Sequence, residues 1–229
     1  MLRRAVAAIA FIILIGSFAF TQETAPKVQV FGGFAVLHVD TAGLTGPVVG
    51  YALDQPPSVF GVRTWYFGWN AEGQYNASRW VGVVVDFGGR RGSPFTAQSQ
   101  GITGLPDSTS YNFLAGPVIS YRTKSIFTPF VHTLFGWERT SLSASTISGA
   151  LAPVSSKATS VMDFTMALGG GADCRISRHI SLRLAQLDWY HTSLNQNDFY
   201  TAAYGPGRFT TLGDIEHNKR ISTGIVATF

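Results

Sequence analysis

A histidine and a serine two positions apart form the pattern in this sequence that comes nearest to a catalytic site. They are His191 and Ser193, within YHTSLN, and the carboxylic acid Glu216 follows near the start of a later segment. A serine next to a histidine that a carboxylate orients can act as a nucleophile in ester hydrolysis. In extended strands, however, Glu216 has the parity of Arg220 and would point away from His191. We therefore expect His191 to be an interfacial residue and Ser193 to begin a loop, and we keep hydrolysis as the third functional alternative.

Three other features could carry chemistry, and each has a structural interpretation. His132 has no second histidine or cysteine at metal-binding spacing, so we expect it to join an internal hydrogen-bond network. Cys174 is the only cysteine, which excludes an intramolecular disulfide and leaves a small apolar side chain. The run 169–171 is three glycines without a following lysine, so we expect it to allow bending or close strand approach. No metal or cofactor is expected.

The composition argues against a soluble helical protein. Charged residues make up 13% of the chain, about half the usual soluble share, whereas aromatic residues also reach 13% and glycine occurs 25 times. The formal net charge of +4 includes Arg3 and Arg4, and the other basic residues are scattered. We therefore expect a strand-rich protein with much apolar surface and no nucleic-acid partner.

The first 25 residues, MLRRAVAAIAFIILIGSFAFTQETA, have the order of a secretory signal peptide. Two arginines precede an apolar core, and the small residues Ser17 and Ala19 provide a cleavage pattern. The apolar stretch 5–20 is shorter than the roughly 20 residues that a membrane-spanning helix needs. We expect a cleaved signal peptide at 1–19 and a single domain at 20–229.

Beyond this leader, apolar and polar residues alternate in segments of about ten residues or slightly more, which is typical of membrane barrels. Three connections between the segments are tight turns, whereas 40–63, 90–109, 140–159 and 193–216 are long and polar. One end with short turns and one with long loops is typical of an outer-membrane barrel. The sequence thus predicts an all-β fold, an eight-stranded antiparallel up-and-down transmembrane β-barrel. The expected strands are 27–39, 64–76, 80–89, 110–122, 127–139, 160–174, 180–192 and 217–229.

The polar side of these strands indicates which face is inside. It carries ionisable residues that could not line the apolar pocket of a soluble barrel but can pair inside a narrow membrane barrel. Large aromatic residues lie near strand ends on the opposite, lipid-facing side, as in an aromatic girdle. Asp173 lies on this polar side as well. The residues expected to form the interior charge network are Glu72, Asp86, His132, Glu138, Asp163, Asp188 and the cation Arg220.

The last segment, which ends in STGIVATF, must close the predicted barrel, because unpaired backbone groups in lipid cost several kcal/mol each. This stretch also resembles the C-terminal signal that the outer-membrane assembly machinery reads. That signal is a polar residue, a glycine, apolar residues at alternating positions and a terminal aromatic. Ser222, Gly224, Ala227 and Phe229 match it, with Ala227 smaller than the residue that the pattern often has.

Several segments together resemble the outer membrane protein beta-barrel domain family, an OmpA-like group of small barrels. They are VQVFGGFAVL, GWNAEGQYNASRWVGVVVDFGG, FLAGPVISYR, TPFVHTLFGWER, RLAQLDWYHT and RISTGIVATF. The resemblance implies a bacterial outer-membrane location, contact with outer-membrane lipid and lipopolysaccharide, insertion by the outer-membrane assembly machinery, and a monomer. It includes no peptidoglycan-binding domain, and Val118 stands where the family often carries a basic residue.

Three functions are compatible with such a barrel. The leading hypothesis is a non-enzymatic protein with a structural or surface-interaction role through its long extracellular loops, since eight strands leave an interior just wide enough for side chains. The alternative is a narrow channel for small solutes or apolar ligands, of the OmpW type, which would need an apolar inner funnel. The third is a hydrolase similar to lipid A deacylases, with Leu194 where those enzymes have asparagine.

Deletion of Phe229 is predicted to impair assembly more than a change in a long loop does, because this residue belongs to the expected assembly signal on the closing strand. The measurement is the heat-modifiable, folded fraction in outer-membrane preparations. Equal folding with and without Phe229 would contradict the assignment.

Overall fold

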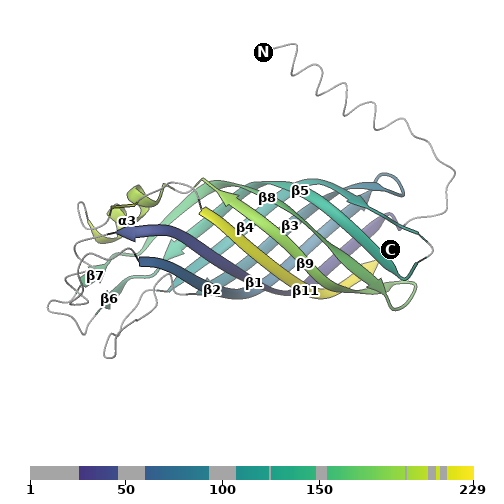
Figure 1. Cartoon of the computed structure of the whole chain (residues 1–229), viewed down its shortest axis with the longest axis horizontal. Coiled ribbons are helices and arrows are strands. Elements are labelled where there is room, and N and C mark those ends of the chain that lie inside the picture. Colours follow the sequence, from purple (N-terminus) through teal and green to yellow (C-terminus); the bar gives the residue numbers. More distant parts are fainter. Residues whose placement is uncertain are drawn as a thin grey trace, which may run out of the picture.

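The computed structural model describes residues 26–45, 60–92, 107–123, 125–147, 154–193, 195–205, 210–211 and 216–229. These residues form a closed barrel of eight antiparallel strands (Figure 1), which confirms the predicted fold class. The expected signal peptide at 1–19 lies outside the described residues. The barrel strands are β1 (Val28–Thr45), β2 (Phe60–Asn76), β3 (Val81–Gly92), β4 (Ser108–Ser120), β5 (Phe127–Leu142), β8 (Thr159–Arg175), β9 (Ile180–Thr192) and β11 (Glu216–Thr228).

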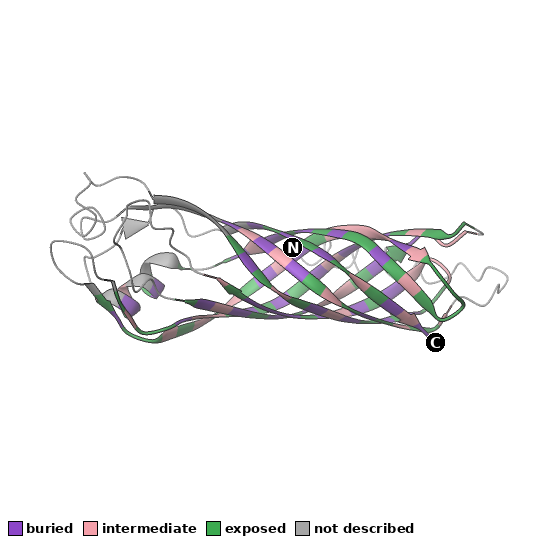
Figure 2. Ribbon diagram, turned by 90° about the horizontal axis from the view of Figure 1, so that it is seen from below, coloured by how far each residue is buried: buried purple, intermediate pink, exposed green. Residues whose placement is uncertain are grey.

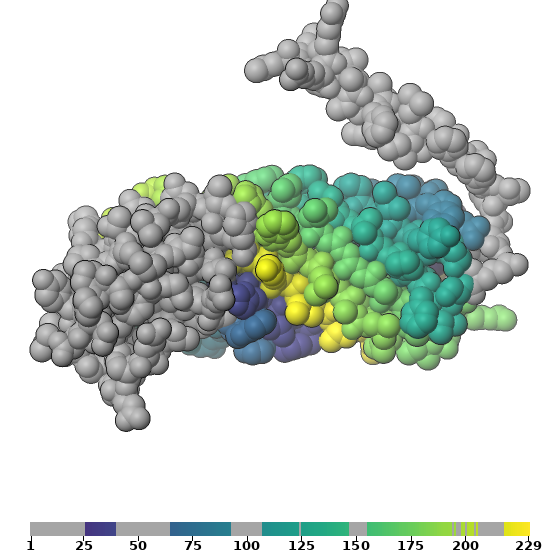
Figure 3. Space-filling view, viewed as in Figure 1, coloured from purple at the N-terminus to yellow at the C-terminus, as the bar shows by residue number. Residues whose placement is uncertain are grey.

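Strand β1 closes the barrel by pairing with both β2 and β11. Its register with β11 runs from Gln29–Thr228 to His38–Lys219. The space-filling view shows the yellow atoms of β11 packed between the purple β1 and the green β9 (Figure 3). Because each of the eight strands has a partner on both sides, their backbone groups can remain hydrogen-bonded in lipid.

The two ends of the barrel differ, as Figure 1 shows. At the short-turn end, tight turns join β2 to β3, β4 to β5 and β8 to β9, and the terminal Phe229 donates its backbone N–H to the Val28 carbonyl at 2.9 Å. The opposite, long-connection end carries the small elements β6 (Ser145–Ile147), β7 (Val154–Ser156), α3 (Gln196–Tyr204) and β10 (Thr210–Thr211).

These small elements lie within the long connections that the sequence predicts at 140–159 and 193–216. Strands β6 and β7 pair as a hairpin, and β10 pairs with the outer end of β1. Helix α3 begins after Asn195, whose side-chain Oδ1 accepts a hydrogen bond from the Asp198 backbone N–H at 3.1 Å. Among the described residues, no helix is both long enough and apolar enough to cross a membrane.

Burial alternates along the strands with the parity that the sequence predicts. In Figure 2 buried and exposed residues alternate along each ribbon of the barrel. On β3, Val83 is 53% exposed whereas Val84 is 1% exposed, and on β5 Trp137 is 55% exposed whereas Glu138 is 5% exposed. Large apolar side chains therefore cover the outside and charged ones lie inside, the reverse of a soluble protein.

One strand departs from strict alternation. On β9 both Leu184 and Ala185 face outward, and the register with β8 jumps from Ala172–Ala185 to Asp173–Arg183. The extra residue is a β-bulge, in which two residues of one strand oppose a single residue of its neighbour. Alternation continued from Trp189 would place Arg183 in lipid, but the bulge turns this side chain into the lumen, where it is 2% exposed.

The orientation in the membrane can be tested by labelling single cysteines in a Cys174→Ser background. Ala144, which is exposed at the long-connection end, and Ser177, which is exposed in the turn between β8 and β9, are each replaced by cysteine. On intact cells a membrane-impermeant maleimide is expected to label Ala144→Cys but not Ser177→Cys, because polar loops cross during insertion while short turns stay in the periplasm. Labelling of Ser177→Cys alone would show the opposite orientation.

Candidate functional site in the barrel interior

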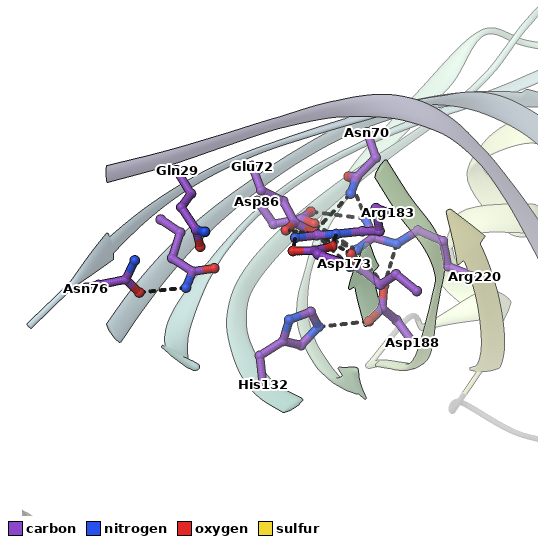
Figure 4. A network of polar contacts seen from close by, with 12 residues as sticks. Gln29, Asn70, Glu72, Asn76, Asp86, His132, Asp173, Arg183, Asp188 and Arg220 are labelled. Atoms are coloured by element: carbon purple, nitrogen blue, oxygen red, sulfur yellow. Dashed lines mark hydrogen bonds and ion pairs between the residues drawn. The ribbon is translucent and has the colours of Figure 1, made fainter. Parts of the chain in front are cut away.

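Arg220 on β11 lies at the centre of the polar interior. Its guanidinium donates hydrogen bonds to Asp188 (2.8 Å), Asp86 (2.7 Å) and Asn70 (2.7 Å), as Figure 4 shows in part. The side chain is 1% exposed, and its guanidinium carbon lies 5.0 Å from the centre of the Tyr190 ring. A buried cation is stable only where carboxylates and other hydrogen-bond acceptors surround it. Asp188, Asp86 and Asn70 provide these acceptors for Arg220.

Arg183 on β9 forms the second centre, nearer the short-turn end. Its Nε donates to Asp173 at 2.8 Å, and its Nη1 donates to Glu72 at 2.6 Å. The guanidinium carbon lies 4.3 Å from the ring centres of both Phe31 and Phe130. Two cation–π contacts thus add to two ion pairs and hold this side chain across the lumen.

Gln186 connects the two arginine centres, and His132 joins the network at Asp188. Gln186 Nε2 donates to Glu72 at 2.7 Å and to Asp188 at 2.9 Å. His132 Nε2 lies 2.8 Å from the other carboxylate oxygen of Asp188. His132 therefore belongs to the internal hydrogen-bond network. Among the described residues, no group of three or more His, Cys, Asp or Glu side chains is arranged to hold a metal ion.

A third arginine, Arg90 on β3, extends the network toward the long-connection end. It donates to Asn112 at 2.7 Å and lies 3.4 Å from Glu138, and its guanidinium carbon is 5.1 Å from the Tyr190 ring centre. Asn112 in turn donates a hydrogen bond to Asp86, which also accepts one from Arg220. The three arginines therefore belong to one hydrogen-bonded network. Figure 4 shows the part of this network around Arg183 and Arg220.

Glycine in the 169–171 run makes room for these side chains. A Cβ atom on Gly169 would collide with the carboxylate of Asp188, and one on Gly171 would lie 3.0 Å from both Gln186 Cα and Phe130 Cζ. Gly169 therefore lets the carboxylate lie against the inner wall at this point. The expected close approach at this run is between backbone and side chain as well as between strands.

Arg122 closes the interior at the short-turn end. Its guanidinium donates to Gln29 (3.0 Å), Asn76 (3.1 Å) and the carbonyl of Arg79 (2.9 Å). Arg79 returns two hydrogen bonds to the Arg122 carbonyl, so the turns after β2 and β4 are clamped together. Burial lowers the pKa of Arg122, and the charge of Asp173 opposes this shift.

The sequence matches the outer membrane protein beta-barrel domain family over residues 6–207. The chain belongs to this family. Its closed eight-stranded fold and its apolar outer wall are those of a protein of the bacterial outer membrane. A comparison with curated proteins found no match.

Solved structures of outer-membrane proteins share the fold of this family member. Ail of Yersinia pestis, crystallised with the heparin analogue sucrose octasulfate, has 14% identity and a TM-score of 0.51, covering 90% of this chain and all of that one. Neisserial surface protein A has 11% identity and a TM-score of 0.51, with 88% and 97% covered. The outer membrane protease OmpT of Escherichia coli has 11% identity and a TM-score of 0.51, with 93% and 100% covered. At these identities the likeness shows the fold alone.

Alternation identified most of the charged interior of this family member but missed two of its cations. The structure brings Glu72, Asp86, His132, Glu138, Asp173, Asp188 and Arg220 into the network. Arg90 falls in the predicted connection 90–109, one residue beyond the predicted strand. Had that strand been extended, Arg90 would have shared the inward-facing parity of Asp86. Arg183 could not be found in this way, because it is the bulge on β9 that turns it inward.

Asp163 is the expected interior residue that does not join the network. It is half-buried on β8, where its backbone pairs with Glu138, and its Oδ2 atom is buried without a hydrogen-bond partner among the described protein groups.

The backbone register does not place Glu216 opposite His191, as the hydrolase alternative would favour. Backbone register pairs His191 with His217 and pairs Glu216 with Thr192, which faces the lumen. The side chain of Glu216 lies outside the described residues. Ser193 is exposed just after the end of β9, where its backbone N–H donates to Phe164 at 3.1 Å.

Arg183→Ala and Arg220→Ala are each predicted to lower the free energy of unfolding by about 3–5 kcal/mol, because each leaves buried carboxylates without their cation. Arg178→Ala, in the exposed turn after β8, is the matched control and should change it by less than about 0.5 kcal/mol. Urea unfolding in lipid vesicles, followed by tryptophan fluorescence, measures all three.

A double variant separates the ion pair from general packing loss. Removing Asp173 together with Arg183 should cost less than the sum of the two single changes, because neither partner is then left alone. If Arg183→Ala and Arg178→Ala unfolded at the same urea concentration, the network would not stabilise the barrel.

Proposed function

We propose that this protein is a closed, non-enzymatic outer-membrane barrel with a structural or surface-interaction role, carried by its long extracellular connections. One observation carries the proposal: the ion pairs that cross the lumen. Arg183 on β9 reaches Glu72 on β2, and Arg220 on β11 reaches Asp86 on β3. In each pair the two strands are three steps apart around a ring of eight, so the side chains lie nearly across the barrel.

The narrow channel is less well supported than the closed barrel. An eight-stranded barrel has an interior that side chains can fill, and here the side chains of Arg220, Tyr190, Gln186 and Phe31 are among the largest that are fully buried. The Arg122 contacts add a polar closure at the short-turn end. An apolar funnel for a hydrophobic ligand would have to pass three buried arginines and their carboxylates.

The hydrolase alternative rests on residue types and not on geometry. The fold likeness to a protease is at 11% identity and does not transfer an activity. Glu216, whose carboxylate would have to orient His191, is in backbone register with Thr192 instead. We therefore assign His191 and Ser193 to the outer rim of the wall.

The long-connection end is where a surface interaction would take place. It carries a hairpin, a helix and a short strand beyond the barrel, and α3 buries Phe199 and Ala203 in packing with this end. One structural relative, Ail, is called an attachment protein and was crystallised with a sulfated sugar analogue. That likeness makes a surface ligand a reasonable subject for study and says nothing of its identity here.

Several features of the cell biology belong to the same proposal. Residues 1–19 would be removed as a signal peptide, leaving 20–229 as the mature domain. The assembly machinery would recognise Ser222, Gly224, Ala227 and Phe229. The inserted barrel would be a monomer in contact with outer-membrane lipid and lipopolysaccharide. No peptidoglycan or nucleic-acid partner is proposed.

Conductance of planar bilayers tests whether the lumen is closed. The purified protein is predicted to give no current steps above the baseline of the bilayer, because we expect the side chains that pair across the narrow lumen to block the passage of ions. A porin reconstituted in the same way is the positive control. Reproducible steps from the folded protein would contradict the closed barrel and favour the channel.

A further inference from the structure

We infer that the outer wall carries a binding site for a phosphorylated acyl lipid, formed by an aromatic groove over β2, β3, β4, β5 and β8 with Arg139 at its margin. The proposed occupant is the phosphorylated glycolipid of the outer leaflet, lipid A. This inference rests on the proposed orientation of the barrel but not on its lumen being closed or on any loop ligand.

The groove lies along two rows of large side chains on the outer wall. Backbone register places Trp69, Gly89, Tyr111, Arg139 and Met162 side by side on five successive strands, all on the outer wall. Phe87, Phe113 and Trp137 form the next row toward the short-turn end. Apart from Gly89, the residues of both rows line a groove of about 280 Å³, together with Gly88 and Asn112.

Gly89 lies between the two rings that flank the groove. A Cβ atom there would lie 2.7 Å from Trp69 Nε1 and 3.0 Å from Tyr111 Cε1, so the rings lean into the space that the missing side chain leaves. Farther along, the Phe87 and Phe113 rings are 4.8 Å apart and form an apolar side. An apolar channel on a lipid-facing wall fits an acyl chain, because chain and wall have the same polarity.

Arg139 provides the charge that selects the headgroup. It faces outward, like Trp137 two residues earlier, and in the described part of the chain its polar contact is the Ser160 hydroxyl at 3.4 Å. Arg91, in the row above, differs because it already pairs with Asp107 at 2.5 Å. Among the described residues this exposed guanidinium, at the level of the aromatic girdle, therefore has no anionic partner. Phosphate is an anion that a guanidinium can bind in bidentate fashion.

The position along the barrel favours the outer leaflet as the source of this phosphate. Arg139 is three residues from the outer end of β5, on the side of the long connections. The neighbouring Trp69, Tyr111 and Trp137 have polar ring atoms that suit the boundary between acyl chains and headgroups. With the long connections outside, the phosphate at that boundary belongs to lipid A and not to a glycerophospholipid of the inner leaflet.

Native mass spectrometry of the full chain folded in detergent, titrated with diphosphoryl lipid A, tests the site. Arg139→Ala is expected to weaken lipid A binding about fivefold, the effect of one basic residue near an anionic lipid surface. Lys219→Ala is the matched control, since Lys219 is also an exposed cation toward this end but lies on β11, away from the groove. It should change binding by less than about twofold.

A second pair of variants tests the groove apart from the charge. Trp137→Ala removes a wall of the groove and should weaken binding, whereas Trp189→Ala removes a side chain of the same exposure, 55% in both cases, elsewhere on the wall. Folding of each variant is checked by heat-modifiability. Equal effects of Arg139→Ala and Lys219→Ala, or of Trp137→Ala and Trp189→Ala, would overturn the site.

The lipid itself is varied in the same experiment. Dephosphorylated lipid A should bind the native protein as weakly as lipid A binds Arg139→Ala. Phosphatidylglycerol that binds as tightly as lipid A, with the same dependence on Arg139, would overturn the assignment to lipid A. Because none of these measurements involves conductance or the loops, failure here would leave the closed barrel standing.

Discussion

The absence of water in the hydrocarbon layer is the constraint on which this structure depends. Backbone groups that face lipid have to be paired within the protein, so a sheet that crosses the membrane must close on itself. Here β1 meets this requirement by pairing with β2 on one side and β11 on the other. Closure at eight strands makes the interior so narrow that inward side chains from nearly opposite strands touch one another.

That narrow interior explains why a charged network can be buried at all. Each carboxylate loses water when it enters the lumen, and a single ion pair often does not compensate for this loss. In this barrel Arg183 and Arg220 each have several acceptors, and Arg183 also lies between two phenylalanine rings. Gly169 completes the fit, since any larger residue would displace the carboxylate of Asp188.

The outer wall obeys a different requirement, because its solvent changes from acyl chains to headgroups along the strand. Apolar side chains cover the middle, and tryptophan and tyrosine gather toward the boundary. Within that pattern the wall around Gly89 is unusual, since a glycine stands where its neighbours are aromatic and an arginine follows in the same row. Protein carboxylates pair with the inner arginines and with Arg91 on the outer wall, whereas the polar contact of Arg139 among the described residues is the Ser160 hydroxyl.

The sequence by itself determined the class of fold, the number of strands and the face that most residues occupy. Alternation has a period of two, so a run such as 81–87 assigns each side chain to lipid or lumen without knowledge of the neighbours. It placed Glu72, Asp86, Glu138, Asp188 and Arg220 inside, as found. It did not determine which of them meet, because contacts across the lumen join β9 to β2 and β11 to β3, which depend on closure and register. Nor did it find Arg183: a bulge shifts the parity by one residue, and its location is set by how β9 fits between β8 and β11, a property of three paired strands and not of one.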